Sequence, residues 1–332
     1  MLDPAAKILV IHVARIGDTL LITPALRALK AACPQGRLDC LLHPARRALL
    51  ENLPFIDELG AITPKTACVR GRFAGKSYDY ALVYGHDAPL VRYALRVADK
   101  VIAFRQRADE LNARLWRVVA SPTQPMHAVH ERLMLATELG VTTTDHHLAC
   151  VPTEAEIAAA RARVKSHAPG RPLIGFQVAS FPTKAYRDWP VESFAELGRR
   201  LLARYPNAHM VLLGGEESRA KATWLARQLG DRAFAAAGQF GLRATVALMR
   251  QLDLYIGVDT GPTHIAGALG IPVVALYHCR HRGVHLAPLQ HPRLEVVEHP
   301  APDSDCAPST PMAAISVDTV WEAAQRLLPP AP

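Results

Sequence analysis

The chain has 332 residues, of which 50% are hydrophobic and 20% are charged, and its formal net charge at pH 7 is +8. This length exceeds one ordinary core and suits two α/β domains, each with enough apolar residues to be well packed. No apolar run approaches the ~18 residues of a membrane-spanning helix. The chain also opens without a basic segment and a cleavable apolar one, so we expect a cytoplasmic protein.

Apolar runs typical of strands alternate with amphipathic stretches typical of helices from the first residues onward. In the first half of the chain we expect strands at 7–12, 38–42, 58–62, 80–84 and 100–104. The helices that we expect around them lie at 24–32, 88–96 and 127–139. Such alternation predicts a parallel sheet with helices on both faces.

The alternation restarts after a helix near 153–165 and a linker at 167–172 that contains glycine and proline. The second half is expected to contain strands at 173–177, 209–213, 253–258 and 272–277. Its expected helices lie at 191–204, 217–229 and 242–250. We therefore place an N-terminal domain at residues 1–166 and a C-terminal domain at residues 167–315. A last helix at residues 316–330 is expected to pack back across the hinge between the two domains.

The most informative segment is 259–272, Asp-Thr-Gly-Pro-Thr-His-Ile-Ala-Gly-Ala-Leu-Gly-Ile-Pro, which directly follows an apolar run typical of a strand. Gly261 gives the backbone freedom for a turn, and Pro262 suits the first turn of a helix, where its missing N–H has no partner to lose. The pattern predicts a helix N-terminus at the carboxyl end of a parallel strand, where α/β proteins hold phosphate groups. A crossover helix capped by Asp259 or Thr260 is the plainer alternative.

The six cysteines, at positions 33, 40, 68, 150, 279 and 306, contain no CxxC pair and no regular disulfide spacing. We interpret them as reduced thiols, several of them in the core. His278, Cys279, His281 and His285 lie close together in the sequence and could be considered as metal ligands. A second ligand cluster with finger-like spacing is missing, so we favour a flexible loop rich in imidazole and expect no metal site.

Residues 92–117 hold seven basic and three acidic residues, and they include Arg92, Arg96, Arg105, Arg107 and Arg114. Such a run is often only a solvated helix face. It is equally consistent with a patch that meets an anionic membrane surface or a phosphorylated acceptor. Nucleic acid is not expected as a partner, because no interleaved aromatic residues or recognised binding motif accompany the arginines.

Four segments of the chain resemble one known family. The segment 259–272 is similar to the Asp-Ser/Thr-Gly-x-x-His-x-Ala-Ala-x-Gly-x-Pro signature of the family 9 glycosyltransferases, the ADP-heptose:lipopolysaccharide heptosyltransferases. The other three, in the same order as in the family, resemble its first strand with a Gly-Asp turn, its mid-chain helix and its Lys/Arg-x-Trp-Pro block; they lie at 7–20, 126–140 and 187–194. The resemblance implies the GT-B architecture, two Rossmann-like doubly wound domains that face each other across a cleft.

The resemblance also implies an inverting, metal-independent transferase that moves heptose from ADP-L-glycero-D-manno-heptose to the lipopolysaccharide inner core. The enzyme would need no cofactor, and we expect a monomer that is peripheral on the inner face of the inner membrane, where it meets its lipid A–core acceptor. The basic residues between 92 and 117 then favour the acceptor or membrane patch. Two alternatives stay open: another nucleotide sugar with a glycan or protein acceptor, and a non-catalytic paralogue that only binds sugar nucleotides.

Inverting transfer needs a base for the acceptor hydroxyl and positive charge for the departing diphosphate. The resemblance implies that Asp18, in the Gly-Asp turn, is the general base, although the residues alone also suit a helix N-cap. It implies that Arg187 contacts the diphosphate, where a guanidinium can bind two oxygens at once. Lys184 is a weaker candidate for the same task, and Trp189 reads as a packing residue.

The remaining donor-site candidates follow the strands of the second half. The resemblance implies a hydroxyl contact to phosphate from Ser180 or Thr183, an adenine contact from Phe240, donor-sugar contacts from Asp259, and backbone N–H contacts from Thr260 and Gly261. Glu216 or Glu217 occupies the position where nucleotide-binding folds place a ribose-binding acid. His264 lies on the same predicted helix. It is a donor-site candidate, and a structural role is the alternative.

The chain departs from the family pattern after Tyr277. Where the family commonly continues Gly-Pro-Thr/Ser, this chain has the sequence His-Cys-Arg-His-Arg-Gly at 278–283. The loss of glycine and proline changes the loop, and two arginines add charge beside the donor site. The departure therefore bears on the identity of the donor sugar more than on the fold.

Overall fold

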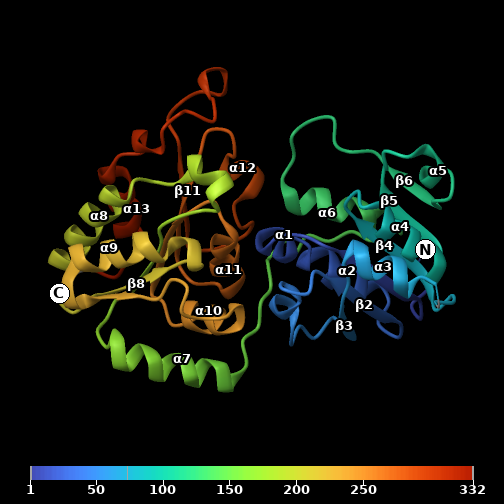
Figure 1. The fold of residues 1–332 in the computed structure, drawn as a ribbon, viewed down its shortest axis with the longest axis horizontal. Helices are drawn as coiled ribbons and strands as arrows, with labels where there is room; N and C mark the ends of the chain where they lie inside the picture. The colour runs from blue at the N-terminus through green and yellow to red at the C-terminus, as the bar shows by residue number, and fades with distance from the viewer. Residues whose placement is uncertain (1, 73, 331–332) are drawn as a thin grey trace. The chain divides into compact units, whose positions relative to one another are not determined.

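The computed structural model describes residues 2–72 and 74–330, and the chain divides into two compact units, Met1–Val151 and Pro152–Pro332. Each unit contains a six-stranded sheet flanked by helices (Figure 1). All the strand pairs in both sheets are parallel. The predicted α/β class with two doubly wound units is therefore observed.

The sheet of the N-terminal unit has the strand order β3-β2-β1-β4-β5-β6. These strands are β1 (Lys7–His12), β2 (Arg37–Leu42), β3 (Glu58–Ala61), β4 (Tyr78–Tyr84), β5 (Ala98–Phe104) and β6 (Arg117–Val119). The order runs outward from β1 in one direction and from β4 in the other. The loops that follow β1 and β4 therefore diverge at the carboxyl edge of the sheet, which is where doubly wound folds bind ligands.

The helices of this unit connect successive strands. They are α1 (Ile16–Leu21), α2 (Thr23–Ala32), η1 (Arg47–Leu50), α3 (Pro64–Arg70), α4 (Ala88–Val97), α5 (Asp109–Asn112) and α6 (Ala128–Thr137). Alternate residues of the central strands, such as Leu9 and Val83, pack with Leu90 and Ala94 of α4 in one buried cluster. Because side chains of a strand alternate between its faces, the intervening residues are left to pack on the opposite face.

The sheet of the C-terminal unit repeats this topology with the order β12-β11-β10-β7-β8-β9. These strands are β7 (Leu173–Gln177), β8 (His209–Leu213), β9 (Ala233–Ala235), β10 (Leu254–Val258), β11 (Val273–Tyr277) and β12 (Leu294–Glu298). The order reverses between β7 and β10. The loops after these two strands are the corresponding ligand-binding position of this unit.

The C-terminal unit has four long helices on or near its sheet and several shorter ones. They are α7 (Glu154–His167), η2 (Pro182–Arg187), α8 (Val191–Arg204), η3 (Glu216–Ser218), α9 (Arg219–Leu229), η4 (Gly230–Arg232), α10 (Leu242–Met249), α11 (Gly261–Leu269), α12 (Gly283–Leu286), η5 (Asp303–Asp305), η6 (Met312–Ala314) and α13 (Val317–Leu327). Side chains of α8, α9 and α13 share one buried cluster with β7, β8, β10 and β11.

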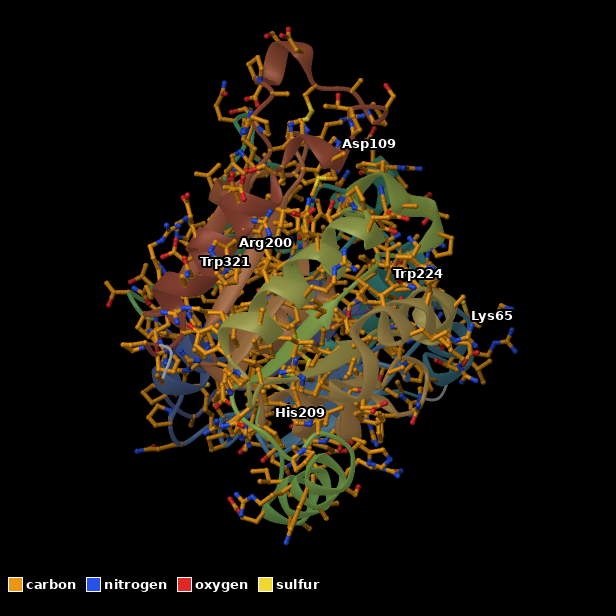
Figure 2. The ribbon with its side chains drawn as sticks, turned by 90° about the vertical axis from the view of Figure 1, so that its left-hand side faces the viewer. Lys65, Asp109, Arg200, His209, Trp224 and Trp321 are labelled. Atoms are coloured by element: carbon orange, nitrogen blue, oxygen red, sulfur yellow. A yellow bond between two sulfur atoms is a disulfide. The ribbon has the colours of Figure 1, made fainter. Side chains whose placement is uncertain are left out.

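The last helix, α13, packs within its own unit. Figure 2 shows Arg200 of α8 beside Trp321 of α13, and the Arg200 guanidinium binds the Asp318 carboxylate at 2.5 Å. The inner face of α13 is apolar and contributes Val320 and Leu327 to the core. The observed packing of this helix is therefore against α8 and the β10-β11-β12 side of the C-terminal sheet.

The helix α7 belongs to the C-terminal unit of the structure. It lies against α10, and the Glu156 carboxylate of α7 forms an ion pair with Arg243 of α10. That guanidinium lowers the pKa of Glu156 to about 2. These contacts place the unit boundary near residue 151, whereas the sequence analysis set it after residue 166.

Candidate functional site

In the N-terminal unit, Asp18 lies on α1 directly after the first strand. It is an interior residue of the helix, and Arg15 holds the N-cap position, so the carboxylate does not act as the cap. The Arg132 Nη2 atom of α6 lies 3.2 Å from Asp18 Oδ1. The side chain of Arg132 is 15% exposed and that of Asp18 is 39% exposed. The carboxylate is thus held from one side by a guanidinium and stays accessible to a small molecule.

His12, the last residue of β1, holds the backbone of the same turn. Its Nε2 atom lies 3.1 Å from the Asp18 carbonyl oxygen, and its ring meets Tyr84 edge to face at 5.5 Å. The Tyr84 hydroxyl in turn donates to the Arg132 carbonyl oxygen at 2.8 Å. Burial, followed by the positive charge of Arg132, lowers the pKa of His12 to about 4, so the ring is neutral at pH 7.

These two partners of Asp18 were not among the residues chosen from the sequence. His12 and Arg132 both lie in segments that the sequence analysis matched to the family, 7–20 and 126–140. The sequence feature that could have identified His12 is its position at the end of a buried strand, where the strand order reverses. Their roles depend on a contact between residues far apart in the chain, which a single sequence does not display.

In the C-terminal unit, Arg187 and Asp259 form a buried ion pair. Arg187 Nη1 lies 2.7 Å from Asp259 Oδ2, with the two side chains 17% and 4% exposed. Asp259 follows β10, and Arg187 ends η2, which follows β7. The structure therefore brings together two predicted donor-site residues at the reversal of strand order. Trp189 is 1% exposed and donates to the Ile315 carbonyl oxygen, as its packing interpretation requires.

The segment after β10 forms the predicted turn and helix, α11. Thr260 holds the N-cap position but makes no side-chain cap hydrogen bond, and the Asp259 carboxylate is engaged by Arg187. Gly261 begins the helix with Pro262 in its first turn, and Gly270 ends it in the left-handed conformation, φ 66°. His264 lies inside the helix and is 4% exposed. The helix start consequently presents the backbone N–H of Gly261 beside the Arg187–Asp259 pair.

The hydroxyl candidates after β7 differ in their surroundings. Ser180 is buried, and its hydroxyl lies 2.6 Å from Asp188 Oδ1, which also accepts from the Ser180 backbone N–H. The Lys221 ammonium group binds the other oxygen of Asp188 at 2.7 Å. Thr183 is exposed. Ser180 thus stabilises the loop, and Thr183 is the hydroxyl that faces solvent.

Lys184 and the two glutamates lie on the surface of the unit. The Lys184 ammonium group lies 5.8 Å from the centre of the Tyr186 ring. Glu216 forms an ion pair with Arg219 at 2.5 Å, and Arg219 also donates to the Gly238 carbonyl oxygen. Glu216 and Glu217 belong to η3, directly after β8, and both are exposed. This is the strand end at which a ribose-binding acid was expected.

Phe240 lies in the loop after β9 and is partly buried. Its ring meets Phe234 at 6.2 Å, and the Arg163 guanidinium of α7 lies 5.5 Å from its centre. The ring therefore contacts one aromatic ring edge to face and one guanidinium. An exposed face of such a ring is suited to stacking with a base.

The five candidate arginines of the basic patch between 92 and 117 fall into two groups. Arg92 pairs with Glu110 at 2.9 Å, and Arg96 donates to the Gly71 carbonyl oxygen. Arg105, Arg107 and Arg114 form no ion pair with any residue that the structure describes. The positive charge of the second group is thus not balanced within the N-terminal unit.

Arg105 and Arg107 line a cavity of about 390 Å³. The cavity lies at the carboxyl ends of β4, β5 and β6, and its other lining residues are His86, Gln106, Ala120 and Ser121. Gln106 is 4% exposed and donates through Nε2 to two backbone carbonyl oxygens, while its Oε1 has no partner among the described residues. A cavity with two unbalanced guanidinium groups is suited to an anionic group that also carries hydroxyls.

The loop after β11 differs from the sequence expectation. Cys279 and Cys306 form a disulfide with a Cα–Cα distance of 5.9 Å, so the interpretation of all six cysteines as reduced thiols is wrong for this pair. Cys33, Cys40, Cys68 and Cys150 are thiols. The loop is not an open, flexible segment either, because His278 is fully buried and Tyr186 hydrogen bonds to His281 at 2.7 Å.

Comparison with known proteins gives a consistent result. The profile of glycosyltransferase family 9 (heptosyltransferase) matches residues 76–308. Lipopolysaccharide heptosyltransferase 3 of Escherichia coli is 24% identical over 276 residues, which cover 79% of this chain and 80% of the relative. Lipopolysaccharide heptosyltransferase 2 of Salmonella typhimurium is 26% identical over 309 residues, which cover 82% of each chain.

Two solved structures share the fold along nearly the whole chain. A family 9 glycosyl transferase from Veillonella parvula superimposes with a TM-score of 0.86 at 22% identity and covers 98% of both chains. The E. coli ADP-heptose lps heptosyltransferase II gives a TM-score of 0.76 at 22% identity and covers 97% of this chain and 98% of its own. The predicted GT-B class is thereby confirmed. No helix in the described part of the chain is long and apolar enough to span a membrane.

Proposed function

Because the chain belongs to glycosyltransferase family 9, the heptosyltransferases, we propose that it moves heptose from ADP-L-glycero-D-manno-heptose to the lipopolysaccharide inner core. The chain is a glycosyltransferase, and its relatives are enzymes of lipopolysaccharide heptose transfer. The donor, the inverting course of the reaction and its independence of metal are parts of the proposal.

The Arg187–Asp259 pair at the start of α11 is the observation that carries the proposal. A departing nucleoside diphosphate gains negative charge, and a guanidinium and free backbone N–H groups are the donors that best stabilise it. Arg187 and the Gly261 N–H lie at the strand-order reversal of one Rossmann-like unit, where such a fold binds nucleotides. Asp259 orients Arg187 through this buried pair.

The N-terminal unit supplies the other half of the chemistry. The acceptor hydroxyl gives its proton to the Asp18 carboxylate while its oxygen forms a bond to the anomeric carbon of the donor. The bond from that carbon to the diphosphate breaks on the opposite side, and the nucleoside diphosphate leaves with the electron pair. This in-line course inverts the configuration. Arg132 and His12 fix the side chain and the backbone of Asp18 for this step.

The charge of the leaving group is taken up by groups of the protein, so the proposal includes no metal and no cofactor. Arg187 and the helix start of α11 supply the positive potential that a divalent ion supplies in other transferases. We place Thr183, Lys184, Phe240 and the acids Glu216 and Glu217 around the rest of the nucleotide.

The acceptor is proposed to be a lipid A–core molecule at the inner face of the inner membrane, which the enzyme meets as a peripheral protein. Arg105, Arg107 and Arg114 carry the unbalanced charge that attracts such an anionic surface, at roughly 1 kcal/mol for each basic residue near it. The cavity beside Arg105 and Arg107 is large enough for part of one acidic or phosphorylated sugar. We propose that the enzyme acts as a monomer.

A second candidate donor is favoured by the loop at 278–283. The sequence there departs from the family pattern and lies beside Tyr186 and Arg187, so a nucleotide sugar other than ADP-heptose is an alternative substrate. A paralogue that binds a sugar nucleotide without turnover is the remaining alternative. A positioned base such as Asp18, with two residues that hold it, argues for catalysis.

The test is a reaction of the purified full-length protein with ADP-heptose and a panel of lipid A–core acceptors. ADP release and the mass of the glycan product are measured together. A product heavier by one heptosyl group, formed with stoichiometric ADP, is the expected result. Transfer only from another nucleotide sugar would show that the proposed donor is wrong. Binding of ADP-heptose without any product would support the non-catalytic alternative.

A further inference from the structure

The disulfide between Cys279 and Cys306 lies beside the proposed nucleotide site. We propose that these cysteines form a reversible dithiol–disulfide pair, and that the oxidised form binds the donor diphosphate more tightly. The inference rests on the proposed function for the assignment of Arg187 to the diphosphate. All the residues that it uses belong to the C-terminal unit.

The disulfide joins two segments that are separated by 27 residues in the chain. One is the loop that follows β11, and the other is the segment between β12 and α13. Polar contacts reinforce the same junction: His278 Nε2 lies 3.0 Å from the Thr310 carbonyl oxygen, and Arg282 donates to Asp303 Oδ1 at 2.6 Å and to the Ala301 carbonyl oxygen at 2.8 Å. The loop is thus anchored to the second segment, and the disulfide is the covalent part of the anchor.

A short series of contacts connects this anchored loop to Arg187. The His278 ring, adjacent to Cys279, meets the Tyr186 ring edge to face at 5.2 Å. The Tyr186 hydroxyl hydrogen bonds to His281 at 2.7 Å, so the loop holds Tyr186 at two points. The Arg187 guanidinium lies 5.7 Å from the centre of the Tyr186 ring. Tyr186 therefore connects the disulfide-bonded loop to the guanidinium that pairs with Asp259.

The ion pair in the noncovalent part of the anchor is weak by itself. The Arg282–Asp303 ion pair is exposed, with side chains 24% and 81% accessible, and exposed ion pairs contribute little to stability. Opening the disulfide removes the covalent link that closes the segment from Cys279 to Cys306, and residues 278–283 regain conformational freedom. Tyr186 and Arg187 would then have to be ordered when the nucleotide binds, which lowers its affinity.

The surroundings of the two sulfurs suit exchange with small thiols. Cys279 is 3% exposed, whereas Cys306 is only partly buried, so an external thiolate reaches Cys306 first. The four other cysteines are thiols in the same structure. In the cytoplasm, where we propose that the enzyme acts, disulfides are typically transient and redox-sensing rather than structural.

The chemistry needs a low-molecular-weight disulfide as oxidant, such as glutathione disulfide. The Cys306 thiolate attacks one of its sulfurs and releases one thiolate, which leaves a mixed disulfide on Cys306. The Cys279 thiolate then attacks the Cys306 sulfur, the Cys279–Cys306 bond forms, and a second small thiolate leaves. The pair loses two electrons and two protons, and the oxidant takes up both. Reduction by a small thiol reverses the same two steps.

The experiment measures ADP affinity of the full-length protein across a series of ratios of reduced to oxidised glutathione. Calorimetry gives the dissociation constant, and alkylation with mass spectrometry reports the fraction of Cys279 and Cys306 in the disulfide. We expect ADP to bind about 5-fold or more tightly to the oxidised protein. In C306S the affinity should equal that of the reduced wild type at every ratio.

The matched control is C68S, which removes an exposed thiol outside the pair. It should keep the full redox response of the wild type. A response that disappears in C68S but persists in C306S would overturn the proposal. So would an ADP affinity that stays constant while alkylation shows the pair opening and closing. The side chains of His278, Cys279 and Cys306 have their possible ligand atoms within 4.8 Å of one another. If Zn²⁺ restores affinity to the reduced wild type and a chelator removes it, these three residues form a metal site and the proposal fails.

A second readout separates this inference from the proposed function. Hydrogen exchange of residues 184–187 and 278–283 is compared in the oxidised and reduced protein without nucleotide. Faster exchange in both segments after reduction supports the coupling through Tyr186 even if ADP binds in neither state, in which case the assignment of the nucleotide has failed. Unchanged exchange at 184–187 would overturn the coupling even if ADP binds well.

Discussion

The Arg132 guanidinium lies 3.2 Å from the Asp18 carboxylate, although 114 residues separate the two in the chain. The contact joins α6 to α1 at the strand-order reversal of the N-terminal sheet. Arg132 is largely buried, whereas Asp18 keeps a substantial exposed surface. The guanidinium therefore orients the carboxylate from inside the unit and leaves its outer oxygen for an acceptor hydroxyl.

The first prediction concerns this carboxylate. D18N should lower turnover by about 10²–10⁴-fold, because an amide cannot take the proton of the acceptor hydroxyl. The dissociation constant of ADP should hardly change, since Asp18 belongs to the N-terminal unit. Turnover is measured as ADP release with saturating donor and acceptor, and ADP affinity by calorimetry. Normal turnover in a folded D18N protein would remove Asp18 from the catalytic residues.

The second prediction concerns the buried Arg187–Asp259 pair. R187Q leaves a carboxylate that is 4% exposed without its cation, and breaking a buried pair from one side costs about 3–5 kcal/mol. The double variant R187Q/D259N removes both charges, so its loss of stability should be smaller than the sum of the two single losses. Urea unfolding gives the three free-energy differences. All three variants should bind ADP more weakly.

The control pair for that cycle is Arg326 and Glu295, an ion pair at 2.9 Å in the same unit whose side chains are 56% and 27% exposed. Substitution of Arg326 by glutamine should change the free energy of unfolding by only about 0–1 kcal/mol and leave ADP affinity intact. Strictly additive losses at Arg187 and Asp259 would mean that the two charges do not depend on each other.

Long buried strands were the most predictable part of the fold. The expected strands at 7–12, 173–177 and 209–213 coincide with β1, β7 and β8. Such strands are covered on both faces and read as nearly continuous apolar runs. The strands β6 and β9, with three residues each, were not predicted, and neither was β12. All three are edge strands of their sheets, and runs of three residues such as β6 and β9 carry little periodicity.

The candidate site was predictable only as far as each residue follows its own strand. Asp259 directly follows β10 as expected, whereas Asp18 lies within α1 and Arg187 ends η2, each in the segment that follows a predicted strand. Their partners come from remote segments, so the contact of Asp18 with Arg132 required the folded chain. The Cys279–Cys306 bond was missed for the same reason, since cysteine pairing cannot be deduced from spacing alone.

The third prediction concerns the cavity at the ends of β4, β5 and β6. R105Q/R107Q should raise the apparent KM for membrane-embedded acceptor and weaken liposome binding, because it removes two unbalanced positive charges. The effect should fade as salt screens the interaction. The KM for the donor should hardly move. Initial rates and liposome flotation at several salt concentrations provide the measurement.

The matched control for the cavity is R92Q/R117Q, which lowers the net charge of +8 by the same two units. Both of its arginines already have carboxylate partners, Glu110 at 2.9 Å and Glu138 at 3.7 Å. Its KM for acceptor should stay closer to the wild-type value. Equal effects of the two double variants would mean that net charge, and not the cavity, determines the KM for the acceptor.

The fourth prediction concerns metal. Transfer should proceed at its full rate in excess EDTA, because Arg187 and the start of α11 neutralise the departing diphosphate. The rate of product formation before and after chelation, with Mg²⁺ and Mn²⁺ added back separately, is the measurement. Loss of activity in EDTA that either ion restores would contradict a metal-independent reaction.

The fifth prediction follows from the buried ring of His12, whose pKa burial and Arg132 lower from 6.5 to about 4. Between these two values the unfolded chain binds a proton that the folded chain excludes, so the free energy of unfolding falls as the pH is lowered through this window. From pH 7 to pH 5 the loss due to His12 should be about 2 kcal/mol.

The H12Q variant tests this prediction, because its side chain keeps an N–H for the Asp18 carbonyl oxygen and does not titrate. Its stability at pH 7 should be lower than that of the wild type, and the difference should shrink by that amount at pH 5. Urea unfolding of both proteins at the two pH values measures the change, and other titrating groups, including His281, cancel in the comparison. A difference that is the same at pH 7 and pH 5 would mean that His12 takes up its proton equally in the folded and unfolded chain.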